Sequence, residues 1–193
     1  IIGVRSQDGT TLFYPMARNL HHKGVLSLSL APTAESLLPS PMVLKAQDWL
    51  RRLMDHFDYC GVLTLELFVR GDELLVNELA PRVHNSGHWT QNGAVSSQFE
   101  NHMRAISGLP LGSCETLGAS LMLNWVGELP PKDAFLSIPN LHWHDYGKTP
   151  RAGRKLGHAN LVADNLAALQ QQAGLLKDKL SPAQWQRLQS LFG

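Results

Sequence analysis

The chain has 193 residues, 44% hydrophobic and 17% charged, which is the composition of a folded domain and not of a disordered segment. Its formal net charge of +1 gives no reason to expect a nucleic-acid or anionic-membrane partner, and its apolar runs are too short to span a bilayer. The two cysteines, Cys60 and Cys114, form no CxxC motif and no disulfide framework, which fits a reducing compartment.

The first sixty residues predict two strand pairs and a helix. Asp8-Gly9, between short apolar stretches at 3–4 and 11–14, indicates a β-hairpin, and residues 20–30 read as a second strand pair around Lys23-Gly24. Ser40-Pro41 is typical of a helix start, and apolar residues recur at helical spacing from there to Phe57. We expect this helix to pack on a sheet. Because the sequence opens on Ile-Ile-Gly-Val, as if inside a strand, it is expected to be a fragment.

The rest of the chain predicts strands at 62–69 and 74–80 and a helix at 97–107, and the sequence pattern then changes from about residue 112. The helix places Phe99, His102, Met103 and Ile106 on one stripe, and Gly108 follows as a C-terminal cap. Beyond the change, strands are expected at 117–126, 141–146 and 155–162, with short terminal helices capped by Asp164 and Ser181. The sequence therefore predicts a mixed α/β (α+β) fold. Residues 1–112 should form an antiparallel sheet backed by helices, and residues 113–193 a small β-rich subdomain.

A pair of carboxylates is the most informative feature of the predicted strands. If the strands at 62–69 and 74–80 are joined by a three-residue loop centred on Asp72, Glu66 lies directly opposite Glu78, with Cβ atoms about 5 Å apart. Two like charges that close are destabilising unless a proton or a cation joins them, and Mg²⁺ is a cation that carboxylates bind well. The alternative is that both glutamates point to solvent, and a different loop length would break the pairing.

The segment that follows the second strand is rich in directional hydrogen-bonding side chains. Pro81 ends the strand, and Arg82, His84 and Asn85 then begin a run that reaches Gln91. Such residues suit the binding of a small polar anion. His84 and His88 could also indicate zinc, but no cysteine lies nearby and the upstream ligands are oxygens.

A basic segment lies in the C-terminal part of the chain. Four cations lie within eight positions, next to Gly147 and Gly153: Lys148, Arg151, Arg154 and Lys155. Glycines let the backbone approach a ligand and arginine forks match phosphate oxygens, whereas the alternative is a solvated basic turn. The segment is too short and too poor in aromatic residues to be a nucleic-acid surface.

The fifteen residues from Asn77 to Gln91 closely resemble the signature of the 5-(carboxyamino)imidazole ribonucleotide synthase family, within the ATP-grasp superfamily. This family includes the ATPase subunit of phosphoribosylaminoimidazole carboxylase. The resemblance extends along essentially the whole chain, through Phe13-Tyr14-Pro15, the helix that begins Ser97-Gln98-Phe99-Glu100, the stretch 151–158 and the terminal Phe192-Gly193.

The resemblance implies an ATP-dependent ligase of purine biosynthesis. Members convert aminoimidazole ribonucleotide, bicarbonate and ATP to the carboxyamino product, ADP and phosphate by way of carboxyphosphate. Glu66 and Glu78 match the Mg²⁺ ligands, and Asn77 with Glu78 matches the ATP-phosphate site. Arg82, His84 and Asn85 match the segment that holds bicarbonate or carboxyphosphate. Implied ligands of the ribonucleotide's 5′-phosphate are the four basic residues Lys148, Arg151, Arg154 and Lys155.

The resemblance also implies a cytoplasmic homodimer, with neither nucleic acid nor membrane as a partner, and it shows two departures. Ala80 stands where many ATP-grasp enzymes carry a third metal ligand, Asn, and the family's N-terminal domain and ATP-grasp lid are absent from this sequence. We therefore expect the C-terminal half of an ATP-grasp domain that is inactive by itself. The alternatives are another ATP-grasp carboxylate–amine ligase and a non-catalytic binding or oligomerisation module.

Overall fold

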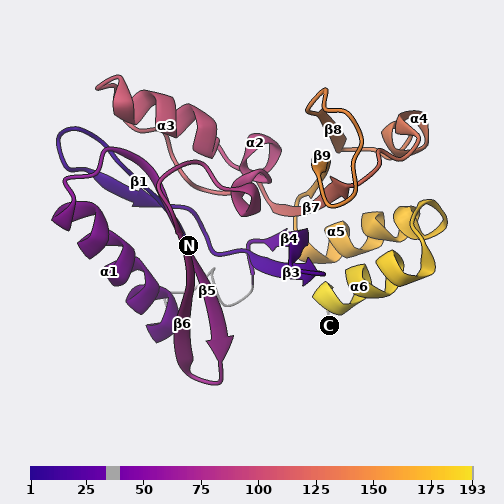
Figure 1. Cartoon of the computed structure of the whole chain (residues 1–193), viewed down its shortest axis with the longest axis horizontal. Coiled ribbons are helices and arrows are strands. Elements are labelled where there is room, and N and C mark those ends of the chain that lie inside the picture. Colours follow the sequence, from indigo (N-terminus) through magenta and orange to yellow (C-terminus); the bar gives the residue numbers. More distant parts are fainter. Residues whose placement is uncertain (34–39, 193) are drawn as a thin grey trace. The chain divides into compact units, whose positions relative to one another are not determined.

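The computed structural model describes residues 1–33 and 40–192 and divides the chain into two compact units (Figure 1). The first unit comprises residues 1–17 and 32–116, and the second comprises residues 18–31 and 117–193. Gly193, part of the predicted subdomain and of the terminal match, lies outside the described residues. None of the helices within those residues has the length and apolar character that crossing a membrane requires.

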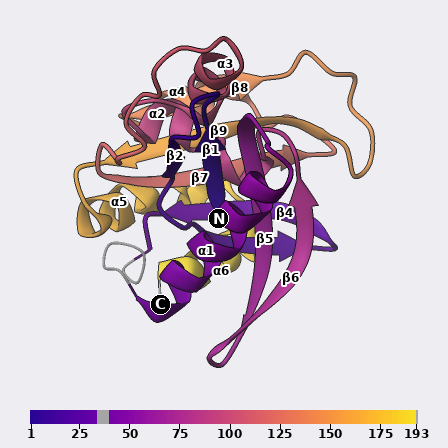
Figure 2. The same cartoon turned by 90° about the vertical axis from the view of Figure 1, so that its left-hand side faces the viewer.

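An antiparallel sheet with the strand order β2-β1-β5-β6 forms the centre of the first unit. Its strands are β1 (Ile2–Arg5), β2 (Thr11–Phe13), β5 (Gly61–Arg70) and β6 (Glu73–Ala80). Strand β1 pairs with β5 only as far as Thr64, so the distal half of the β5–β6 hairpin extends beyond its neighbour as a two-stranded ribbon (Figure 2). Both predicted hairpins of this unit are present.

Helix α1 (Pro41–His56) covers one face of this sheet. It begins as the sequence predicts, with the Ser40 side chain accepting a hydrogen bond from the Val43 backbone N–H and Pro41 at the first helical position. Leu50 and Met54 pack against Leu63 and Leu65, which alternate along β5 and so share one face. The intervening side chains of β5, including Thr64 and Glu66, are thereby directed to the opposite face.

Helix α3 (Gln98–Ile106) contacts β1 and β5, but the face that it buries differs from the predicted stripe. Met103 and Ile106 are exposed, whereas the buried side chains are Gln98, Asn101 and Ala105. The physical reason is that the two buried amides satisfy backbone groups of neighbouring loops. Asn101, for example, bonds both the N–H and the C=O of Gly112. Because each amide offers a donor and an acceptor, it can be buried without an unpaired polar group.

The second unit is built on a five-stranded antiparallel sheet with the order β3-β4-β7-β9-β8. Its strands are β3 (Arg18–His22), β4 (Val25–Ala31), β7 (Ala119–Val126), β8 (Leu141–Asp145) and β9 (Lys155–Ala163). The predicted strand pair near Lys23-Gly24 is therefore present, but β4 pairs with β7, far along the chain. The structural division thus differs from the sequence boundary at 112 in assigning residues 18–31 to the second unit.

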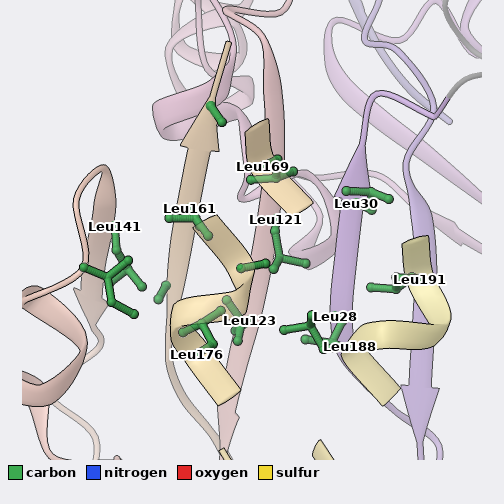
Figure 3. Close-up of a cluster of buried hydrophobic side chains, with 14 of the residues drawn as sticks. Leu28, Leu30, Leu121, Leu123, Leu141, Leu161, Leu169, Leu176, Leu188 and Leu191 are labelled. Carbon is green, nitrogen blue, oxygen red and sulfur yellow. The ribbon is translucent and has the colours of Figure 1, made fainter. Parts of the chain in front are cut away.

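Leucines from one face of this sheet form the core of the second unit (Figure 3). Leu28 and Leu30 of β4, Leu121 and Leu123 of β7, and Leu161 of β9 alternate along their strands and meet the helices. These helices are α4 (Lys132–Leu136), α5 (Leu166–Ala173), the 3-10 turn η3 (Gly174–Lys179) and α6 (Pro182–Phe192).

Two local details of the second unit differ from the sequence prediction. Asn165, and not Asp164, caps α5, because its side chain accepts the hydrogen bond of the Ala168 backbone N–H. The short helix α4 follows Pro130-Pro131, between the strands expected at 117–126 and 141–146, where no helix is predicted from the sequence. Its aromatic residue Phe135 packs against Trp125 and Trp143 of the sheet, and these contacts hold a helix too short to be stable by itself.

Candidate metal and anion site

The β5–β6 hairpin places Glu66 directly opposite Glu78, as the sequence predicts, but by a different construction. Arg70 pairs with Glu73, so the turn is the two-residue Gly71-Asp72 and not a three-residue loop. That turn alone would pair Glu66 with Asn77. A β-bulge between Glu66 and Leu67 leaves Asn77 as an extra residue of β6, and this shift brings Glu78 opposite Glu66.

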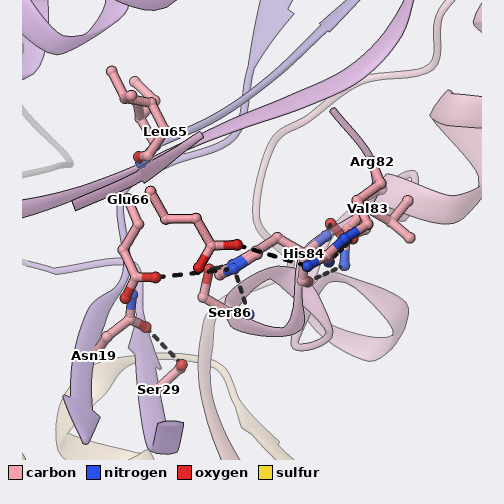
Figure 4. A network of polar contacts seen from close by, with 11 residues as sticks. Asn19, Ser29, Leu65, Glu66, Arg82, Val83, His84 and Ser86 are labelled. Carbon is pink, nitrogen blue, oxygen red and sulfur yellow. Dashed lines mark hydrogen bonds and ion pairs between the residues drawn. The ribbon is translucent and has the colours of Figure 1, made fainter. Parts of the chain in front are cut away.

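His84 completes a three-residue cluster with the two glutamates. One ligand atom from each of Glu66, Glu78 and His84 lies within 4.8 Å of the others. The His84 Nε2 atom is 3.9 Å from Glu66 Oε2, and Figure 4 shows these side chains directed toward one another. The side chain of Glu66 is 12% exposed and that of Glu78 is 50% exposed. One carboxylate therefore lies at the base of the site and the other at its open side.

The loop that follows β6 brings the remaining predicted anion ligands to this cluster. Arg82 Nη2 is 3.7 Å from Glu78 Oε1, and Arg82 Nη1 donates to the backbone C=O of Val83. His84 caps the short 3-10 helix η2 (Asn85–Gly87), which is followed by α2 (Thr90–Gly93). Arg82 and His84 thus lie beside the two carboxylates, and Asn85 follows His84 as the first residue of η2.

Two polar side chains at the site are buried without a hydrogen bond in the described structure. Neither the amide nitrogen nor the amide oxygen of Asn85 has a partner, and the Thr64 hydroxyl, on the Glu66 face of β5, also has none. Leaving such groups unpaired costs about 1–3 kcal/mol each, so their presence favours a site at which a polar ligand bonds them. Sequence reasoning selected Asn85 but missed Thr64, although its alternation with Glu66 could have identified it.

Sequence reasoning also missed Gln98 and Ser86, which contact the backbone and the ring of His84. Gln98 is completely buried, and its amide bonds both the N–H and the C=O of His84. A glutamine at the first position of a helix carries no signal in a sequence. Only the packing of α3 against the loop reveals what this glutamine contacts.

The predicted phosphate-binding residues lie in the second unit, on the connection between β8 and β9 and at the start of β9. Lys148, Arg151 and Arg154 are exposed, and Lys155 is half-buried. The Arg154 guanidinium donates to the Thr149 C=O, and Lys148 Nζ lies 5.1 Å from the centroid of the Tyr146 ring. Lys148, Arg151 and Arg154 thus lie on one connection, and Lys155 begins the strand that follows it, as the sequence predicts. Their binding of a phosphate stays a prediction.

Tyr146 and two histidines support the base of this connection. His144 stacks on His158, with ring centroids 4.3 Å apart, and the Tyr146 hydroxyl is 2.8 Å from His158 Nδ1. Burial raises the pKa of Tyr146 to about 12, so the hydroxyl keeps its proton at neutral pH. Burial, with a smaller contribution from His142, lowers the pKa of His144 and favours its neutral ring.

Two known family models match this chain. Residues 1–99, just over half of the chain, match the ATP-grasp domain, and residues 120–172 match the phosphoribosylaminoimidazole carboxylase C-terminal domain. The part of the chain that forms the sheet with the facing glutamates is therefore part of an ATP-grasp domain.

Relatives with known names narrow the class to one family. N5-carboxyaminoimidazole ribonucleotide synthase of Pseudomonas aeruginosa is 46% identical over 170 residues, which are 88% of this chain and 46% of that protein. The crystal structure of the Thermus thermophilus synthetase of the same name aligns with a TM-score of 0.88 and 48% identity, covering 93% of this chain and 49% of that one. The chain belongs to the N5-carboxyaminoimidazole ribonucleotide synthase family.

A third relative was solved with ligands of the family. The synthase from Aspergillus clavatus, in complex with ADP and 5-aminoimidazole ribonucleotide, aligns with a TM-score of 0.81 at 34% identity. It covers 92% of this chain and 49% of its own chain. The chain thus spans about half the length of the relatives it matches.

Proposed function

We propose that this chain carries the metal–nucleotide site and the bicarbonate-binding loop of a ligase that carboxylates aminoimidazole ribonucleotide. In the proposed reaction, ATP, bicarbonate and the ribonucleotide give ADP, phosphate and N5-carboxyaminoimidazole ribonucleotide by way of carboxyphosphate. The observation that carries this proposal is the Glu66–Glu78 pair beside Arg82, His84 and Asn85, in a chain whose relatives bear this name.

Glu66 and Glu78 fit a divalent cation by the chemistry of their donors. Two carboxylates with oxygens within 4.8 Å of each other repel unless a cation lies between them, and hard oxygen donors suit Mg²⁺. When bound with ATP, Mg²⁺ supplies neutralisation of the phosphate charge during phosphoryl transfer. Ala80 offers no ligand, so the two glutamates would hold the ion together with the phosphate oxygens, and Asn77 lies beside them on the bulge of β6.

Arg82, His84 and Asn85 have the donors that an anionic intermediate requires. The Arg82 guanidinium supplies a planar fork that suits a carboxylate-like or phosphate oxygen pair. The unpartnered amide of Asn85 supplies both a donor and an acceptor, and the His84 ring supplies a nitrogen next to Glu66. Donors placed in advance of charge development are the main source of catalysis in phosphoryl and carboxyl transfer.

The basic connection of the second unit suits the 5′-phosphate of the ribonucleotide. Cations on and next to a glycine-containing connection can approach a phosphate closely. Arg151 and Arg154 supply forks, and Lys148 and the half-buried Lys155 supply point charges. Homodimer formation and a cytoplasmic location, both implied by the family, stay predictions.

The test is ATP hydrolysis by the complete protein with each substrate omitted in turn. We expect ADP release that depends on bicarbonate and is stimulated by aminoimidazole ribonucleotide, with one carboxylated product formed for each ADP. Glycinamide ribonucleotide, formate and biotin serve as controls because they are substrates of other ATP-grasp reactions. Stimulation by one of these controls, with none by aminoimidazole ribonucleotide, would assign the chain to a different ligase.

A further inference from the structure

Gln98, the first residue of α3, directs its side chain at the loop that follows β6. Its Oε1 atom accepts a hydrogen bond from the His84 N–H at 2.9 Å, and its Nε2 atom donates to the His84 C=O at 2.7 Å. The same Nε2 atom lies 3.0 Å from His88 Nδ1. A single buried side chain therefore bonds both backbone groups of one proposed anion ligand and the ring of a second histidine.

The backbone fixes which way the Gln98 amide points. A backbone N–H can only donate and a backbone C=O can only accept, so the amide oxygen must face the His84 N–H and the nitrogen must face the C=O. The second hydrogen of Nε2 is then directed at His88, whose Nδ1 atom accepts it. The two hydrogen bonds between the Gln98 amide and the His84 backbone are called the clamp below. The same amide holds His88 with its ring proton on Nε2.

The ring of His84 is oriented in a similar way by the residue two positions further on. The Ser86 backbone N–H donates to His84 Nδ1 at 3.3 Å, and the Ser86 hydroxyl lies 2.7 Å from the same atom. Because Nδ1 accepts, the ring proton belongs on Nε2, the atom that faces Glu66 at 3.9 Å. Gln98 thus fixes the backbone position of His84, and Ser86 fixes which nitrogen of its ring carries the proton.

Neighbouring residues leave the Gln98 side chain little freedom. The Thr90 hydroxyl donates to the Gly87 C=O at 2.6 Å and accepts from the Gln98 N–H at 3.0 Å. A Cβ atom at Gly87 would lie 2.6 Å from Gln98 Oε1 and would overlap Ile2 Cδ1, so a side chain there would displace the amide. The absence of a side chain at 87 is therefore part of what keeps the clamp in place.

We propose that Gln98 is a positioning residue of the carboxylation reaction. It holds His84 in the place from which the ring meets the bicarbonate-derived anion, and it does so without contacting that anion itself. This inference rests on the proposed function, because it assigns Gln98 a role through His84. A shift of about 1 Å in a positioned group can cost about 100-fold in rate, so loss of the clamp should lower kcat strongly.

The test compares two matched amide-to-acid changes on the same helix, made in the complete protein. Gln98→Glu keeps the acceptor but replaces the donor by a second oxygen that faces the His84 C=O and His88 Nδ1. Asn101→Asp makes the same chemical change one turn away, at an equally buried amide that bonds Gly112 and the Tyr14 hydroxyl. We expect Gln98→Glu to lower kcat about 10- to 100-fold with little change in the KM for ATP. Asn101→Asp should lower the Tm and leave kcat within about twofold of the unmodified protein.

Acidification provides a readout that loss of stability alone would not give. In Gln98→Glu, the protonated carboxyl has one carbonyl acceptor and one O–H donor, and so restores both bonds to His84. Burial disfavours the charged form and raises the pKa of such a carboxyl, so the clamp is present below that pKa and lost as the pH rises through it. The His88 ring bonds the side chain at position 98, and the His84 ring belongs to the residue whose backbone it bonds. Because histidine side chains titrate near neutral pH, every rate is divided by that of the unmodified protein at the same pH. The ratio should rise as the pH falls for Gln98→Glu and stay flat for Asn101→Asp.

Three further results separate the ways in which the proposal can fail. If His84→Ala lowers kcat while Gln98→Glu leaves it unchanged, the clamp proposal is wrong and the proposed function stands. If His84→Ala itself leaves carboxylation unchanged, the role of His84 in the proposed function is wrong, and the role of Gln98 is wrong with it. If Gln98→Glu does not fold, Gln98→Asn replaces it, because its neutral amide is one methylene too short to bond both backbone groups. Unchanged kcat in Gln98→Asn then overturns the proposal.

Discussion

Changing Glu78 to Gln in the complete protein should lower kcat/KM for ATP by at least ~100-fold, or about 2.7 kcal/mol of transition-state stabilisation. The substitution keeps the shape of the side chain and removes one of the two charges that would hold Mg²⁺. Because the metal contributes both to nucleotide binding and to charge neutralisation during transfer, KM for the metal–nucleotide should rise and kcat should fall together. Steady-state kinetics at saturating bicarbonate and ribonucleotide measures both constants.

Glu73→Gln is the matched control for this prediction. Glu73 lies on the same strand and makes an exposed ion pair with Arg70, a kind of contact that contributes about 1 kcal/mol or less. The Glu73→Gln change should leave kcat and KM within about twofold of the values of the unmodified protein. Equal kinetics for the two variants, both close to the unmodified protein, would remove Glu78 from the metal site.

Changing Arg154 to Ala should raise KM for aminoimidazole ribonucleotide and lower kcat/KM for that substrate about 10- to 150-fold. A charge-assisted fork to a phosphate is worth roughly 1.5–3 kcal/mol. Since the 5′-phosphate is remote from the reacting amine, its binding contributes mainly to KM. The KM for ATP should stay nearly unchanged, and initial rates over a range of ribonucleotide concentrations provide the measurement.

Lys177→Ala controls for the simple loss of a positive charge. Lys177 is an exposed residue of η3, in the same unit but not part of the β8–β9 connection. It should not change the KM for the ribonucleotide. If Arg154→Ala alters only the ATP constants, or behaves as Lys177→Ala does, the connection is the solvated basic turn that the sequence also allowed.

The Glu66–Glu78 pairing could be predicted from the sequence, although the three-residue loop from which it was predicted is wrong. Strand alternation and the spacing of the two glutamates are local properties, and they were enough to indicate facing carboxylates. The two-residue turn and the bulge at Asn77 could not be separated from a three-residue turn, because both give the same register at Glu66. A bulge depends on packing around the strand, which the local sequence does not encode.

Features that depend on distant packing were not predictable. Residues 20–30 were correctly predicted to be a strand pair, but the pairing of β4 with β7 joins segments about a hundred residues apart. Helix α3 shows the same limit in its side chains. Hydrophobic periodicity selected Met103 and Ile106, whereas the buried face carries Gln98 and Asn101. Amides that satisfy backbone groups elsewhere give no apolar signal, so the residue that holds His84 is found only in three dimensions.

The most direct test of the metal assignment is a crystal structure of the complete protein with ADP and Mn²⁺. The position of the Mn²⁺ ion is determined by anomalous scattering. Mn²⁺ suits carboxylate oxygens as Mg²⁺ does and can be distinguished from water by its anomalous signal. The facing arrangement predicts one peak in contact with carboxylate oxygens of both Glu66 and Glu78 and with phosphate oxygens of the nucleotide. A peak bound by phosphate oxygens alone, with the two carboxylates directed to solvent, would contradict it.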